Sequence, residues 1–101
     1  MKLFWSELAK RQLKEIHAYY QEKAGVKVAK SVKEKLLRKT KVLIENAEIG
    51  QVEENLSVKG RGFRYLIEGH HKVVYKVYGS HGVILIAAVF DTRRNPSNLR
   101  V

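Results

Sequence analysis

The stretch that decides the fold is FRYLIEGHHKVVYKVYGSHGVILIAAVFD, residues 63–91. Three segments rich in β-branched and aromatic side chains alternate there with two short turns that contain glycine. Such side chains fit a pleated surface, and glycine permits tight turns. The sequence therefore predicts an antiparallel meander with strands at residues 63–68, 72–78 and 83–90. The last strand is apolar at every position, which indicates a central place in the sheet with cover on both faces.

Two amphipathic helices are predicted before the meander, after a short β-compatible segment at residues 2–5. In the first helix, Ser6 is placed to cap the N-terminus, and residues 24–25 end it. Apolar residues then recur at steps of three and four, which puts them on one helical stripe: Ala9, Leu13, Ile16 and Tyr20.

The second helix is expected from Val26 to about Ala47, with Gly50 as a left-handed cap. It continues the same apolar rhythm, so the two helices form a hairpin whose apolar faces pack on the sheet. The predicted order is β-α-α-β-β-β, an α+β fold with the helical hairpin on a mainly antiparallel sheet.

The length of 101 residues fits a single domain, residues 1–101. Twenty Lys and Arg against ten Asp and Glu give a net charge of +10, and both halves of the chain are basic. This charge favours polyanions or an acidic protein as partners.

The chain has no cysteine, and its longest apolar run, residues 83–90, is too short to span a membrane. We expect a cytoplasmic protein without a metal ion or cofactor.

Residues 51–62 form the least regular segment, and we expect Leu56 and Val58 to attach it to the core. The segment ends in Lys59-Gly60-Arg61-Gly62, whose glycines would let backbone amides approach an anion. It lacks the spacing of a nucleotide-binding loop, so a solvated turn is the preferred interpretation.

Nearly the whole chain resembles the RelE/ParE superfamily of bacterial toxins. The resemblance lies in Trp5 with the apolar stripe of the first helix, and in three later segments, residues 64–67, 71–77 and 89–96. It implies a βααβββ toxin of a type II toxin–antitoxin system, neutralised by a cognate antitoxin and able to form a hetero-oligomer with it. RelE-like members cut messenger RNA on the ribosome, whereas ParE-like members block DNA gyrase.

RNA cleavage requires groups that move protons and cations that bind the scissile phosphate. The resemblance to RelE-like toxins implies four candidates for these roles: Arg64, His71, Lys72 and Arg93. Phe63, Tyr65 and Asp91 stand where such nucleases often carry basic residues. The last five residues, 97–101, contain no His, Glu or Tyr. We therefore favour a ParE-like toxin that is not an enzyme over the RelE-like messenger RNA endonuclease.

A third interpretation is a basic nucleic-acid-binding module, but no recognition-helix motif or aromatic ladder supports it.

The predicted contacts with the target or with anions are Lys59, Arg61, Arg64, Arg93 and Arg94. An arginine matches a carboxylate or a phosphate in bidentate geometry. The alternative for the arginine pair, a structural bond with Asp91 or Glu68, stays open. His70 and His71 are interpreted as exposed turn residues.

Overall fold

A computed structural model describes residues 1–55 and 59–93. The predicted βααβββ order is confirmed, with one additional two-residue strand and two short 3₁₀ turns. The elements are β1 (Lys2–Trp5), α1 (Glu7–Ala24), α2 (Val26–Lys41), η1 (Val42–Ile44), β2 (Gln51–Val52), β3 (Phe63–Glu68), β4 (His71–Tyr78), η2 (Gly79–His81) and β5 (Val83–Asp91).

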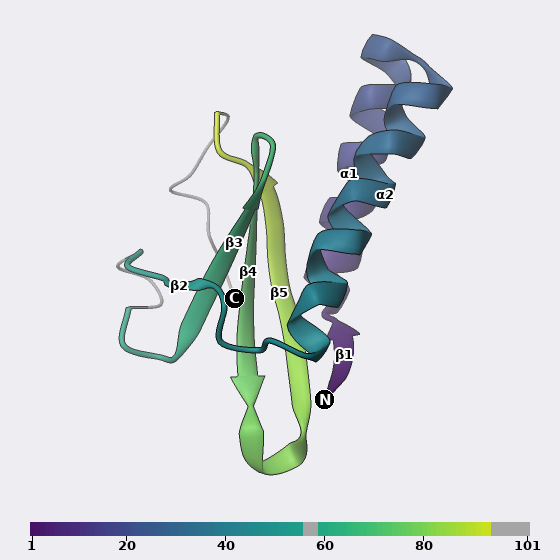
Figure 1. The fold of residues 1–101 in the computed structure, drawn as a ribbon. Helices are drawn as coiled ribbons and strands as arrows, with labels where there is room; N and C mark the ends of the chain where they lie inside the picture. The colour runs from purple at the N-terminus through teal and green to yellow at the C-terminus, as the bar shows by residue number, and fades with distance from the viewer. Residues whose placement is uncertain (56–58, 94–101) are drawn as a thin grey trace.

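The five strands form one sheet in the order β1-β5-β4-β3-β2 (Figure 1). Strands β2 to β5 pair in an antiparallel manner, whereas β1 pairs in parallel with β5. Strand β5 therefore lies between β1 and β4, which confirms the central place predicted from its apolar sequence. An irregularity at Val74 and Tyr75 shifts the pairing of β4 with β5 by one residue.

The helical hairpin begins where the sequence predicts, and its two helices are separated at the predicted residues 24–25. The side chain of Ser6 accepts a hydrogen bond from the backbone N–H of Ala9 at 3.0 Å, and its hydroxyl donates to the carbonyl of Ala87 at 3.0 Å. Ser6 thus caps α1 and attaches it to β5. Gly25 separates the helices with a φ of 94°, a conformation that favours glycine.

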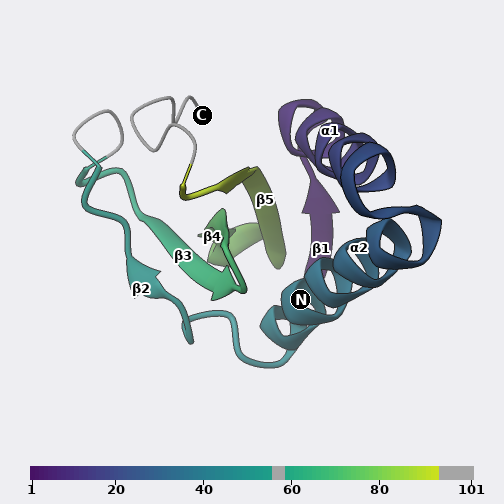
Figure 2. The ribbon, with the colours of Figure 1, turned by 90° about the horizontal axis from the view of Figure 1, so that it is seen from above.

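Both helices lie on the same side of the sheet (Figures 1 and 2). The main core forms between them and that face, and its buried side chains come from α1, α2, η1, β4 and β5: Ala9, Leu13, Leu36, Leu43, Val73, Tyr75, Ile84, Ile86 and Val89. A smaller cluster of Phe63, Val74, Ala87 and Ala88 forms on the opposite face. The alternation of side chains along β4 therefore decides which residues face the helices.

Two expectations about the end of the hairpin are wrong. Helix α2 ends at Lys41 rather than near Ala47, because the chain tightens into η1. A 3₁₀ turn has about three residues per turn, so Leu43 stays in the core without a further α-helical turn. Gly50 is not a left-handed cap either, since it lacks a positive φ. Leu56 and Val58 lie outside the described residues.

Candidate functional site

Three residues, His71, Asp91 and Arg93, meet where β4 begins and β5 ends. His71 and Asp91 are paired across these strands, and the pair lies on the helix-covered face. The Arg93 guanidinium donates to both carboxylate oxygens of Asp91, with Nη2–Oδ2 at 2.8 Å and Nε–Oδ1 at 3.1 Å. The backbone N–H of Arg93 donates to the same Oδ1 at 2.8 Å. Of the alternatives left open for Arg93, the structure has the bond with Asp91.

Asp91 and Arg93 are both charged at neutral pH. The hydrogen bonds from Arg93 lower the pKa of the Asp91 carboxyl to about 2, despite the opposing effect of burial. The carboxylate in turn raises the pKa of Arg93. The Asp91 side chain is 8% exposed and that of Arg93 is 53% exposed, so about half of the Arg93 side chain remains open to a partner.

His71 is buried, with only 5% of its surface exposed, so the interpretation as an exposed turn residue is wrong. Tyr20 of α1 packs against it, with ring centroids 5.9 Å apart in an edge-on arrangement. Burial lowers the pKa of His71, an effect that Asp91 opposes. His71 is therefore neutral near pH 7 and supplies no positive charge there. His70, one residue earlier, is exposed as expected.

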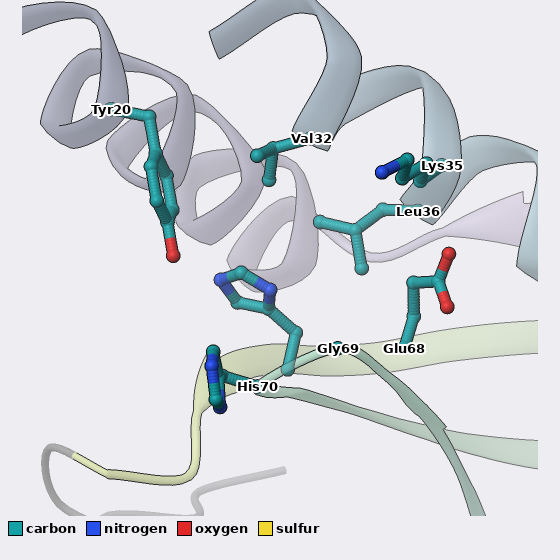
Figure 3. Close-up of a pocket in the computed structure, with 8 residues that line it drawn as sticks. Tyr20, Val32, Lys35, Leu36, Glu68, Gly69 and His70 are labelled. Carbon is teal, nitrogen blue, oxygen red and sulfur yellow. The ribbon is translucent and has the colours of Figure 1, made fainter. Parts of the chain in front are cut away.

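A cavity of about 300 Å³ opens between the helical hairpin and the β3–β4 turn (Figure 3). Tyr20 extends into it from α1, and Val32 and Leu36 project from α2. The remaining lining residues are Lys35, Glu68, Gly69, His70 and His71. Apart from Lys35 of α2, the cavity thus has a mainly apolar wall from the helices and a polar wall from the turn.

Arg64 lies on the same face of the sheet, but away from His71. It is paired with Tyr75, so it is four residues further along β4, roughly 13 Å at the usual rise of a strand. Its Nη1 donates to the carbonyl of Gly50 at 2.8 Å and to that of Glu48 at 3.4 Å. These bonds direct its charge to the backbone that follows the helical hairpin.

Lys72 lies on the opposite face of the sheet, since it alternates with His71 along β4. Its Nζ is 2.6 Å from Oε2 of Glu53, a carboxylate that is only 3% exposed. The same ammonium is 4.2 Å from the centroid of the Tyr65 ring. Glu53 thus neutralises Lys72, and sequence reasoning missed this buried partner because nothing in the polar segment around it marks it as buried.

Lys59 and Arg61 lie in the turn before β3, where Gly60 and Gly62 have φ values of 80° and 85°. Both basic residues are exposed, in agreement with the predicted solvated turn. Lys59 is 3.6 Å from a Glu54 carboxylate in an ion pair that is well exposed on both sides. Such pairs contribute little to stability, so the Lys59 ammonium is available to a partner.

The four candidates for RNA cleavage do not assemble. Only His71 and Arg93 share a location, and there His71 is buried while Arg93 is bonded to Asp91. Lys72 is on the other face, and Arg64 is held by carbonyl oxygens. Arg94, the remaining predicted contact, lies outside the described residues.

Within residues 1–55 and 59–93, no group of three or more His, Asp or Glu side chains is arranged to hold a metal ion. In the same part of the chain, none of the helices has the length and apolarity that crossing a membrane requires.

The helical hairpin on a mainly antiparallel sheet agrees with the RelE/ParE-like fold expected from the sequence, and comparisons with known proteins specify the family. The family described as ParE toxin of the type II toxin–antitoxin system parDE matches residues 3–96. The chain therefore belongs to the ParE toxin family. Among solved structures, the chromosomal ParDE toxin–antitoxin system of P. aeruginosa is similar, with a TM-score of 0.75 and 23% identity over 90% of this chain and 95% of that one. A search of curated proteins finds no match.

Proposed function

We propose that this chain is the toxin of a type II toxin–antitoxin pair, that it inhibits DNA gyrase, and that a cognate antitoxin protein neutralises it. The observation that carries the proposal is the family match over residues 3–96, almost the full length of the chain. Inhibition of gyrase is typical of this family, and the similar solved structure is of a toxin–antitoxin system.

The arrangement of the basic side chains supports inhibition by binding rather than RNA cleavage. An RNA-cleaving site needs an accessible acid or base beside several cations. His71 is 5% exposed, and the Lys72 ammonium is within 2.6 Å of the Glu53 carboxylate. For the contacts with the target we propose Lys59, Arg61 and Arg93, whose side chains are exposed, together with Arg64 and Arg94.

Expression of the chain alone tests the toxin assignment, and two assays on purified protein test the target. Expression should arrest bacterial growth, and coexpression of the protein encoded beside it should restore growth. Purified toxin should inhibit supercoiling by gyrase in a reaction without ribosomes. Codon-phased cuts in ribosome-bound messenger, with normal gyrase activity, would instead identify a RelE-like endonuclease and reject gyrase as the target.

A further inference from the structure

The Nε2 atom of His71 is buried without a hydrogen-bond partner among the described residues. Buried polar atoms in folded proteins nearly always have a partner, so an orphaned one requires an explanation. His71 also lines the cavity between the helical hairpin and the β3–β4 turn. The cavity and the unpartnered atom together indicate a binding site.

The state of the imidazole defines which ligand group it takes. A neutral histidine has one N–H donor and one acceptor nitrogen. A hydrogen bond with the Glu68 backbone favours the protonated His71 ring, so the Glu68 carbonyl is the acceptor and the ring N–H is the donor. Nε2 is then the acceptor, and a ligand must bring it an N–H or O–H group.

The other residues that line the cavity indicate the size and polarity of that ligand. Tyr20, Val32 and Leu36 provide an apolar wall, and the volume of about 300 Å³ is at the small end of ligand sites. A single aromatic ring fits this description better than a large cofactor does. Lys35 and Glu68, of opposite charge, stand at the polar side of the same cavity, so the lining itself leaves the charge of the ligand open.

We propose that this cavity receives one tryptophan or tyrosine side chain from an acidic segment of the antitoxin, and that its N–H or O–H donates to Nε2 of His71. The identity of the partner rests on the proposed function, but the chemistry of the cavity does not. Tryptophan and tyrosine are, with arginine, the residues most enriched among the anchors of protein interfaces, and of these three only the first two bring an aromatic ring. A chain with a net charge of +10 attracts an acidic partner.

Entry of the ring requires Tyr20 to move. Nε2 is covered in this structure, and the Tyr20 ring packs edge-on against His71. Among the described residues, the Tyr20 hydroxyl accepts a long hydrogen bond from Arg93, at 3.5 Å, and its ring also packs edge-on against Tyr19, with centroids 5.3 Å apart. A rotation of this half-buried side chain breaks that long hydrogen bond and the edge-on contact with His71, uncovers the acceptor and leaves room for the ring of the ligand to replace the aromatic contact.

The test is a titration of the full-length ¹⁵N-labelled protein with indole and with 1-methylindole, followed by NMR. The two probes have nearly the same shape, but only indole has an N–H donor. Indole should shift the resonances of Tyr20 and of residues 68–71, and should bind about tenfold more tightly than 1-methylindole, because the methylated ring leaves Nε2 unsatisfied. Equal affinities, or no binding of either probe, would overturn the proposal.

Three variants make the result specific to this cavity. His71→Phe keeps a ring but removes the acceptor, so the two probes should bind it equally. Val32→Phe fills the cavity from α2 and should abolish binding of both, which keeps the test decisive if His71→Phe fails to fold. Lys14→Ala, whose side chain lines a different cavity, should leave both affinities unchanged. Unaltered indole binding to Val32→Phe would overturn the proposal.

The partner is tested separately from toxicity. Val32→Phe should weaken the complex with the protein encoded beside the toxin by tenfold or more, and addition of that protein to the wild-type toxin should displace indole and reverse the indole-induced shifts of residues 68–71. If growth arrest and gyrase inhibition are observed but Val32→Phe binds that protein normally, the proposed function is supported and the proposed aromatic anchor in this cavity is rejected. If the toxin assays fail but indole binds as expected, the cavity is supported as a site for an aromatic ring and the antitoxin is rejected as its partner.

Discussion

The backbone N–H of Gly50 donates a hydrogen bond to the phenolic oxygen of Tyr75, over 2.9 Å in the buried interior. This contact joins the chain after the helical hairpin to the middle of β4. A Cβ at position 50 would lie 2.5 Å from that oxygen and 2.7 Å from the carbonyl oxygen of Tyr65. Gly50 is therefore required for a close approach and not for a left-handed turn.

Replacement of Gly50 by alanine should destabilise the protein. Two of the atoms that the new methyl group would meet belong to a fully buried tyrosine and to the backbone of β3, neither of which can move freely. We expect a loss of about 2 kcal/mol or more in the free energy of unfolding, the range of overpacked cores. Urea denaturation measures it. Gly79→Ala is the matched control, since a Cβ there meets nothing within 4 Å, and an equal loss in both variants would contradict this account.

The strands of the meander could be predicted to within one residue at their ends. Residues 63–68, 72–78 and 83–90 were expected, and the structure has Phe63–Glu68, His71–Tyr78 and Val83–Asp91. These strands carry their own β-branched and aromatic side chains, so local sequence suffices. Strand β2 could not be predicted, because Gln51–Val52 is a strand only through its pairing with β3.

The site was less predictable, because burial depends on residues that are distant in sequence. Alternation along β4 correctly separates His71 from Lys72, but it does not reveal that α1 and α2 cover His71. The burial of Glu53 likewise depends on Lys72, which lies 19 positions later in the chain. Such pairs become visible only once the strands are in register.

The ion pair of Glu53 with Lys72 should be strongly coupled. Glu53 is 3% exposed and Lys72 is 20% exposed, so removal of the lysine leaves a buried carboxylate without its partner. We expect Lys72→Met to lose about 3 kcal/mol in the free energy of unfolding, and Glu53→Gln/Lys72→Met to recover part of that loss.

A double-mutant cycle in urea gives the coupling energy between these two residues. The exposed pair of Lys10 and Glu7 is the control, with side chains 60% and 91% exposed. Its coupling should be below about 1 kcal/mol. Equal coupling in the two pairs would show that burial of Glu53 is not important.

Stability should fall in acid as Asp91 takes up a proton. Its pKa is about 2 in the folded protein, against an ordinary value of 3.8. Between these values the unfolded chain binds more protons than the folded chain, so the pair contributes stability above about pH 4 and loses it as the pH falls toward 2. Chemical denaturation from pH 5 to 2 should show a steeper fall for wild type than for Asp91→Asn. Parallel curves would argue against the Arg93 bond as the cause.

His71 should produce a second pH dependence at higher pH. Burial lowers its pKa below 6.5 in the folded protein, although Asp91 opposes the shift. The unfolded chain therefore takes up the proton first, and stability should decrease as the pH falls from about 7 through the folded pKa. His71→Phe should remove this decrease. His81→Gln, at an exposed position, should retain it, and a decrease that persists in His71→Phe would assign it to another group.

The role of Arg93 in activity can be separated from its role in stability. Arg93→Ala leaves the Asp91 carboxylate, 8% exposed, without its guanidinium partner, so this variant should unfold at a lower temperature. Loss of toxicity in Arg93→Ala, or in Arg93→Ala/Arg94→Ala, therefore has two explanations. Asp91→Asn/Arg93→Ala removes the buried charge together with the arginine and should recover much of the melting temperature.

If Arg93 contacts the target, the restored Asp91→Asn/Arg93→Ala variant should remain folded yet inactive, both in growth arrest and in inhibition of gyrase supercoiling. Asp91→Asn alone keeps the guanidinium and should stay toxic, because the half-exposed face of Arg93 is still available to the target. Full toxicity of Asp91→Asn/Arg93→Ala would remove Arg93 from the contact surface. Arg93 would then serve only to neutralise Asp91, and the proposed contacts would reduce to Lys59, Arg61, Arg64 and Arg94.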